Sequence, residues 1–196
     1  RLVEDSARRV LKLVFRAEET RKEQPLCDYD AHHALARELA DQGAVLLKNE
    51  ENILPLKEGA SVAIIGAMAK NMRFQGAGSS HINPRQKREP LEVLTGCCYA
   101  PGCDDRGDTT EALLTEAARA AQSSQVAVVF AGLPERYESE GFDRSDMKLP
   151  KGHLHMIQAV AQANPNTVVV LLCGCVVECP WADQVKGILY MGLPGQ

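Results

Sequence analysis

The feature that most constrains the fold is an alternation of short, wholly apolar runs with amphipathic segments. The apolar runs are Ala44–Leu47, Ser61–Ile65, Val126–Ala131, Thr167–Leu172 and Val185–Met191. Thr110–Gln122 and Lys151–Gln162 instead carry apolar residues at helical spacing. Strands that are apolar throughout are usually buried on both faces, in parallel sheets whose crossovers are helices. The sequence therefore predicts an α/β fold, a three-layer sandwich whose mostly parallel sheet is covered by helices on both faces.

The N-terminal part of the chain has a different pattern. Leu2–Glu19 shows helical spacing of apolar residues with a strongly charged opposite face. The polar stretch Thr20–Tyr29, which contains Pro25, is typical of a linker. Asp30 is predicted to cap a second helix over residues 31–41 that ends at Gly43.

Composition and charge exclude several classes of protein. The 196 residues, 45% of them hydrophobic, suffice for one substantial domain plus an appendage. The net charge of −4 gives no electrostatic reason to expect nucleic acid or an anionic membrane as a partner. The longest apolar run, Thr167–Cys173, is far too short to span a bilayer. We therefore expect neither a nucleic-acid nor a membrane protein.

The seven cysteines favour free thiols. An odd number of cysteines in a chain with a large aliphatic core argues against a secreted disulfide scaffold, so we expect a reducing, cytoplasmic setting. The spacing Cys173-x-Cys175-x3-Cys179 suggests a metal site, but it lacks the paired C-x2-C units of structural zinc sites. Small buried thiols are the better interpretation, and we expect no metal.

Two loops are long enough to carry chemistry, and both follow apolar strands. They are residues 67–90 and residues 132–150, and in parallel sheets the site lies at the carboxyl ends of the strands. The first loop contains glycines at 76 and 78, but they lie ten or more residues past the strand, too far for a dinucleotide-binding turn. Ser79 and Ser80 lack the context of a nucleophile elbow. We therefore expect no cofactor.

The second loop is rich in carboxylates and contains two aromatic residues, Tyr137 and Phe142. A carboxylate beside an aromatic ring and other acids can have a raised pKa, as a general acid near neutral pH requires. The aromatic rings can stack on a sugar. The alternative is a solvated acidic loop, and the residues alone do not single out one acid among Glu135, Glu138, Glu140, Asp143 and Asp146.

Several blocks along the chain, taken together, point to a family. They include His33 to Asn49, Val62-Ala-Ile-Ile-Gly66, Gln75-Gly-Ala-Gly-Ser-Ser80, Glu140-Gly-Phe-Asp-Arg144, Pro180-Trp181 and Leu193-Pro-Gly-Gln196. In order and spacing, from about residue 30 to the last residue, they resemble the second domain of family 3 glycoside hydrolases. The block that begins at Glu140 is similar to the acid/base block of the β-glucosidase branch.

The resemblance implies a role for one glutamate. In that family a barrel domain supplies an aspartate nucleophile and the sandwich domain supplies the general acid/base, the two carboxyls lying about 5–5.5 Å apart in retaining enzymes. By its place in the block, Glu140 takes the acid/base role, and Glu138 is the rival. Tyr137 and Phe142 become possible walls of the aglycone site, with core packing of one of them equally open.

The same resemblance predicts the domain organisation and the partners. Residues 1–29 resemble the final helix of the barrel and the linker, and residues 30–196 an α/β-sandwich domain truncated at its C-terminal end. The expected partners are the barrel domain of the same protein and a β-linked glucoside or oligosaccharide, hydrolysed at the non-reducing end. An uncovered sheet face would favour a homo-oligomer, or a chain that is one piece of a larger protein. The chain by itself is expected to be inactive; the alternative is a non-catalytic sugar-binding or subunit-contact module.

Overall fold

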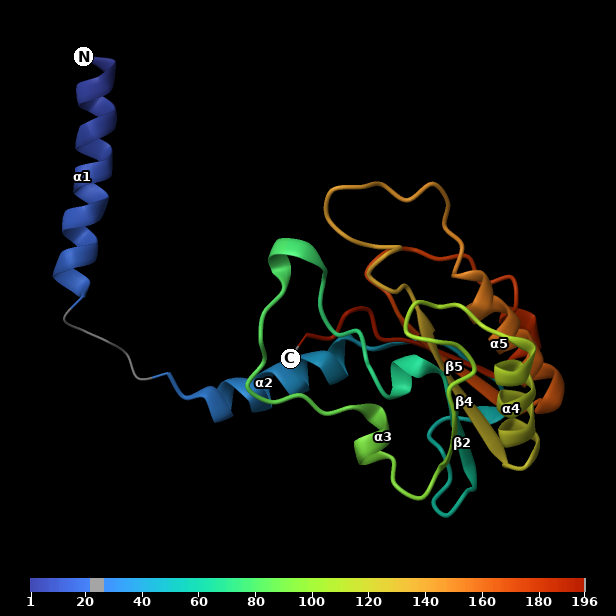
Figure 1. The fold of residues 1–196 in the computed structure, drawn as a ribbon. Helices are drawn as coiled ribbons and strands as arrows, with labels where there is room; N and C mark the ends of the chain where they lie inside the picture. Colours follow the sequence, from blue (N-terminus) through green and yellow to red (C-terminus); the bar gives the residue numbers. More distant parts are fainter. Residues whose placement is uncertain (22–26, 196) are drawn as a thin grey trace. The chain divides into compact units, whose positions relative to one another are not determined.

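The structure is a computed structural model that describes residues 1–21 and 27–195. The helices and strands are α1 (Leu2–Thr20), α2 (Tyr29–Gly43), β1 (Val45–Asn49), β2 (Val62–Ile65), α3 (Pro90–Val93), β3 (Cys98–Ala100), α4 (Glu111–Gln122), β4 (Val126–Gly132), α5 (Lys151–Ala163), β5 (Thr167–Leu172) and β6 (Gly187–Tyr190) (Figure 1). Short 3₁₀ helices lie between them, among them Gly78–Ser80.

The chain divides into two compact units, Arg1–Ala34 and Leu35–Gln196. The first contains α1, whose apolar residues, Leu11 and Phe15 among them, are exposed within the described residues. The predicted linker lies mostly in residues 22–26, outside the described residues, so the predicted domain boundary at residue 30 stays a prediction. The predicted cap of α2 is wrong by two residues: Asp28, not Asp30, accepts the N–H of Ala31, at 3.0 Å.

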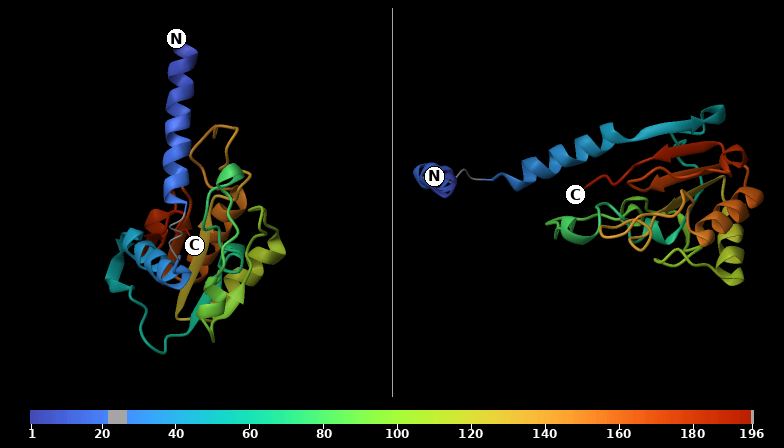
Figure 2. Two further views of the ribbon diagram at one scale, coloured as in Figure 1. Left: turned by 90° about the vertical axis from the view of Figure 1, so that its left-hand side faces the viewer. Right: turned by 90° about the horizontal axis from the view of Figure 1, so that it is seen from above.

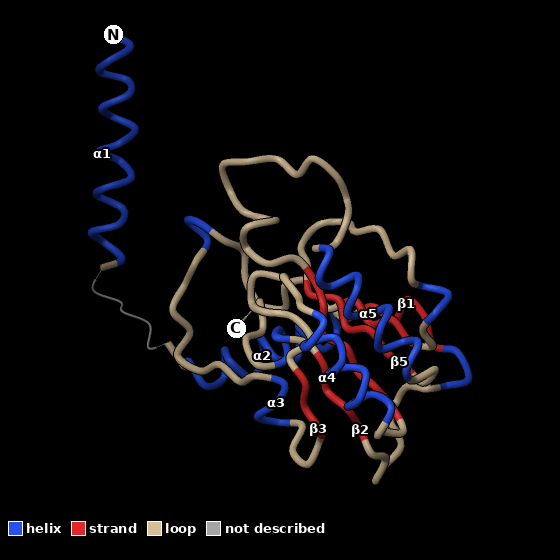
Figure 3. Tube along the Cα trace, turned by 45° about the vertical axis from the view of Figure 1, so that its right-hand side comes forward, coloured by secondary structure: helices blue, strands red, loops and turns tan. Residues whose placement is uncertain are grey.

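The second unit is built on a six-stranded sheet, whose strands are red in Figure 3, in the order β1-β6-β5-β4-β2-β3 given by their hydrogen bonding. Every neighbouring pair is parallel except β1 and β6, so the sheet is mixed. Four of the five predicted apolar runs form the inner strands β2, β4, β5 and β6, and all of β5 is buried; the first run forms β1 at the edge, where residues 45–47 are exposed. Gly66, which ends β2 with φ +115°, is required here, because a Cβ would lie 2.2 Å from the carbonyl oxygen of Phe130 on β4.

Both faces of the sheet are covered. Helices α4 and α5 pack side by side on one face (Figure 1), over a core that includes Val129, Leu171 and the fully buried Trp181. The opposite face buries Phe130 and Val170 beneath the short α3 and the segment between β1 and β2. The predicted α/β sandwich is thus the observed architecture, with one antiparallel strand at its edge.

The order of the strands fixes where a site can form. From β2 the chain passes to β3, on one side of β2, and then returns to β4, on the other side. From β4 it continues away from β2 to β5. The loops that follow β2 and β4 therefore diverge from two neighbouring strands, and such a switch point is where parallel sheets place their ligands. These are the two long loops that the sequence analysis singled out.

Candidate active site

The two long loops meet beyond the carboxyl ends of β2 and β4. In the right-hand view of Figure 2 the loop after β2, in green, and the loop after β4, in orange, extend from the same end of the sheet. The contact between them is made by Ser79 and Glu140. The Ser79 hydroxyl lies 2.9 and 2.7 Å from the two carboxylate oxygens of Glu140, and the Ser79 N–H donates to Oε2 at 3.2 Å.

Glu140 is exposed and has no charged partner among the described residues. Hydrogen bonds from the Ser79 hydroxyl, and then from its backbone N–H, hold the pKa of Glu140 below its ordinary value. The predicted raised pKa is therefore not a property of this loop by itself. Gly78 permits the close approach: it has φ +73°, and a Cβ there would lie 3.0 Å from Oε2 of Glu140.

Glu138 has a very different environment. Its Oε2 accepts from the guanidinium of Arg73 at 2.5 Å and from the N–H of Gly174 at 3.0 Å. Burial acts to raise the pKa of Glu138, but the Cys175 thiol, the Gly174 N–H and the Arg73 charge outweigh it and lower that pKa. Glu138 is thus held as a buried carboxylate, with little surface left for a substrate.

The two aromatic residues of the loop, Tyr137 and Phe142, also differ in their burial. Tyr137 is partly buried and packs against the core beneath α5, with the guanidinium of Arg136 5.1 Å from its ring centre. This favours the core-packing alternative for Tyr137. Phe142 is 49% exposed and lies two residues from Glu140, so its role as a wall of the aglycone site stays a prediction.

The remaining polar groups order the loop. Nε2 of His81 lies 2.8 Å from Oε1 of Glu135, which gives a second link between the two loops. Arg144 donates to the carbonyl oxygens of Val176 and Lys148 at 3.0 and 3.1 Å. The loop is therefore tied down on both sides of Glu140.

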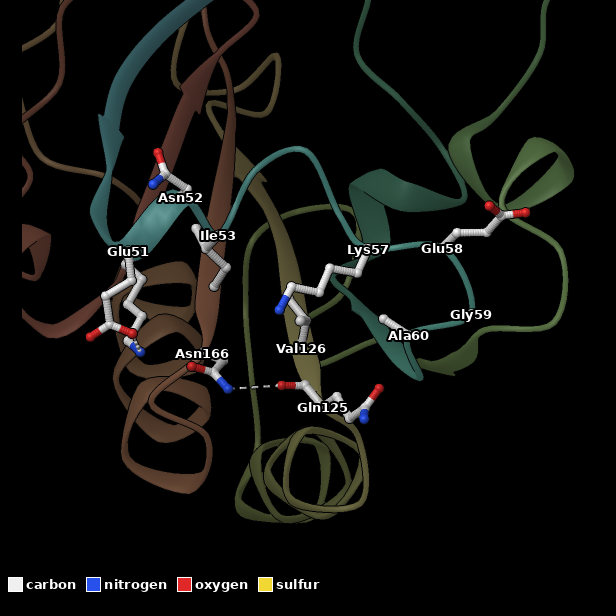
Figure 4. A pocket seen from close by; sticks show the side chains of 11 residues that line it. Glu51, Asn52, Ile53, Lys57, Glu58, Gly59, Ala60, Gln125, Val126 and Asn166 are labelled. Carbon is white, nitrogen blue, oxygen red and sulfur yellow. Dashed lines mark hydrogen bonds and ion pairs between the residues drawn. The ribbon is translucent and has the colours of Figure 1, made fainter.

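Two cavities lie at opposite ends of the strands. One, of about 460 Å³, is lined by Arg73, His81 and Glu135 and adjoins the candidate site. The other, of about 580 Å³, is lined by Gln125 and Asn166, which precede β4 and β5 (Figure 4). Figure 4 shows Lys57 extending into it while Glu58 points the other way. It lies at the amino ends of the strands and takes no part in the Glu140 site.

The cysteines are free thiols. Cys173 is buried at the end of β5, and Cys175 is exposed beside Glu138. Within residues 1–21 and 27–195 no three His, Cys, Asp or Glu side chains are grouped so as to hold a metal ion. In the same residues no helix combines the length and the apolar character that crossing a membrane requires.

Sequence reasoning did not single out Arg73 or His81, and it set Ser79 aside. Ser79 and His81 belong to the block from Gln75 that carries the family resemblance, and Arg73 lies two residues before it. The glycines of that block, weighed as a phosphate-binding turn, instead bring the backbone against Glu140.

Comparison with known proteins gives the family. The model of the glycosyl hydrolase family 3 C-terminal domain matches residues 44–196. Thermostable beta-glucosidase B of Acetivibrio thermocellus is 48% identical over 96% of this chain and 26% of its own length. An exo-alpha-(1->6)-L-arabinopyranosidase of Bifidobacterium longum is 40% identical over 86% of this chain and 24% of its own.

Solved structures agree. The crystal structure of a GH3 beta-glucosidase of Bifidobacterium adolescentis superimposes with a TM-score of 0.87 at 39% identity, over 93% of this chain and 28% of that one. The chain spans about a quarter of the length of the relatives it matches. Because the family model covers most of the chain, this chain belongs to glycoside hydrolase family 3, and its residues 44–196 match the C-terminal domain of that family.

Proposed function

We propose that this chain supplies the general acid/base, Glu140, of a retaining β-glycosidase that acts on terminal non-reducing β-D-glycosides, with β-glucosides as the first substrates to test. The observation that carries the proposal is the contrast between two glutamates of one loop. Glu140 is exposed at the switch point of the sheet, and among the described residues it is hydrogen-bonded by Ser79 alone, whereas the Glu138 carboxylate is bound by Arg73 and Gly174. Of the two, Glu140 is the one that can reach a glycosidic oxygen.

The chemistry needs a second carboxylate, which we expect from a barrel domain in a longer protein. That carboxylate attacks the anomeric carbon while Glu140 protonates the departing oxygen, and Glu140 then removes a proton from the water that releases the sugar. The lowered pKa of Glu140 suits the second step, which needs the ionised form. For the first step, burial against the barrel and the negative charge of the nucleophile both act to raise the pKa of Glu140.

The relatives support a glycosidase and leave the sugar open. One is named a beta-glucosidase and another an arabinopyranosidase, although both match this chain at 40% identity or more. Groups that recognise the sugar ring are therefore expected mainly on the barrel. Phe142, exposed beside Glu140, is proposed as a wall of the aglycone site.

Replacing Glu140 by Ala in the longer protein tests the assignment. Loss of general acid/base catalysis should lower kcat/KM by about 10²–10⁴-fold on a glucoside with a poor leaving group. An activated aryl glucoside should lose much less in the first step, and azide should restore turnover by forming a β-glucosyl azide, because azide needs no general base. Asp146→Asn removes a charge from an exposed position of the same loop and is the matched control, with activity close to that of the wild type.

The rival assignment predicts a different result. If Glu138 were the acid/base, Glu138→Ala would be rescued by azide and Glu140→Ala would not. If neither variant lost activity selectively on poor leaving groups, the chain would have a non-catalytic role in the longer protein.

A further inference from the structure

We infer that Arg73 is a positioning residue for Glu140, fixing the acid/base loop through Glu138 without touching the substrate. The inference rests on the proposed function of Glu140. It is carried by a buried guanidinium that joins the loop after β2 to two separate points of the loop after β4.

Arg73 donates hydrogen bonds to the loop after β4 at two places, at its first residue and two residues before Glu140. Its Nη1 donates to the carbonyl oxygen of Leu133, the first residue after β4, at 2.7 Å, and to Oε2 of Glu138 at 2.5 Å. Its Nη2 donates to the backbone carbonyl of Glu138 at 2.9 Å. Arg73 therefore fixes both the backbone and the side chain of a residue only two positions from Glu140.

Burial makes this arrangement rigid. The side chains of Arg73 and Glu138 are 7% and 12% exposed, so water cannot readily replace either partner. The fork of a guanidinium can serve a carboxylate and two carbonyls at once, and a lysine ammonium cannot reproduce that geometry. The pair is thus specific for arginine.

A third loop completes the anchor. The N–H of Gly174, which follows β5, donates to the same Oε2 of Glu138 at 3.0 Å. A Cβ at Gly174 would lie 3.1 Å from Oε1, so this approach is also close. Glu138 is consequently the point where the loops after β2, β4 and β5 converge, and Arg73 supplies its countercharge.

The same loop that carries Arg73 also carries Ser79, which holds the Glu140 carboxylate directly. Arg73 therefore sets the separation of the two loops, and Ser79 sets the direction of the carboxylate across it. A shift of about 1 Å at a reacting group can cost about 100-fold in rate, so loss of the Arg73 contacts should be felt at Glu140.

A positioning role and a purely structural role predict different kinetics for Arg73→Lys in the longer protein. If Arg73 positions the acid/base, kcat/KM, which reports the first step, should fall by about 10- to 100-fold on a poor-leaving-group glucoside, with the loss on a dinitrophenyl glucoside limited to about 3-fold. A general loss of folded enzyme lowers both rates equally. Arg88→Lys, at an exposed arginine of the same loop, is the control and should leave both rates unchanged.

A double-mutant cycle with Glu140→Ala gives the decisive result. If Arg73 acts through Glu140, adding Arg73→Lys to Glu140→Ala should cause no further loss on the poor leaving group. An undiminished further loss, or equal losses on both substrates, would overturn the inference while leaving the proposed function intact. Full activity of Glu140→Ala alone would instead refute the proposed function. Should Arg73→Lys fail to fold, Glu138→Gln, which keeps the shape and removes the charge, must show the same selectivity for poor leaving groups.

Discussion

His153 lies on α5 with its ring fully buried, and its burial should make the stability of the domain depend on pH. Its Nδ1 lies 2.9 Å from the carbonyl oxygen of Gly132, and its Nε2 has no hydrogen-bond partner in the described part of the chain. The N–H of Gly132 also lies against Nδ1, at 3.2 Å, so in the neutral ring Nδ1 either donates to the Gly132 carbonyl or accepts from the Gly132 N–H, according to the tautomer. Protonation would place a charged N–H in the apolar core, and burial accordingly lowers the pKa of His153 to about 4.

The size of the effect follows from the shift. The ordinary pKa is 6.5, so between that value and about 4 the unfolded chain binds a proton that the folded chain does not. The stabilisation is therefore complete above pH 6.5 and is lost progressively as the pH falls towards about 4. At 1.36 kcal/mol per unit the total is about 3 kcal/mol, of which about 2 kcal/mol is lost between pH 7 and pH 5.

Urea unfolding at pH 7 and pH 5 measures this loss. Trp181 is the only tryptophan and is fully buried, so its fluorescence reports the sheet unit. His153→Gln cannot take up a proton, and its stability should fall by about 2 kcal/mol less than that of the wild type over this range. His155→Gln, at an exposed histidine on the same helix, should follow the wild type. Equal losses in all three proteins would refute the reasoning.

Three further changes test the site and the core. Ser79→Ala removes a donor that stabilises the Glu140 carboxylate, so the pKa of Glu140 should rise. The alkaline limb of the pH profile of kcat/KM should then move to higher pH, whereas Ser79→Thr, which keeps the hydroxyl, should leave that limb in place. Gly78→Ala adds a Cβ 3.0 Å from Glu140 at φ +73°, and should lower kcat and destabilise the domain by about 1 kcal/mol in urea. Ile157→Ala empties a fully buried position and should cost about 2–5 kcal/mol by the same assay, with an unchanged m-value.

Much of the fold could be predicted because its signals are local. The apolar run of β5 and the helical spacing of α5 each specify an element within a few residues, and both were placed within one residue. β3 was missed, because it has three residues, Cys98–Ala100, at the edge of the sheet. The last strand was predicted over Val185–Met191 and is observed over the shorter Gly187–Tyr190.

The candidate site could be predicted only in part. Its loop was evident from length and charge, and the family resemblance pointed to Glu140. What separates Glu140 from Glu138 physically is a set of contacts from residues far along the chain: Arg73 is 65 residues from Glu138, and Gly174 is 36. No pattern within the loop encodes these contacts. The lowered pKa of Glu140 has the same origin, because Ser79 is 61 residues away.

The convergence of three loops on Glu138 also bears on how the site forms during folding. Each of its anchors is contributed after a different strand, so the arrangement around Glu140 cannot exist until β2, β4 and β5 lie in register. Contacts of such long sequence separation form only after the intervening chain has been closed into loops, at a cost in entropy. Site geometry is therefore an indicator of a completed sheet, and a short peptide bearing residues 132–150 would keep the acidic sequence without the geometry that gives Glu140 its environment.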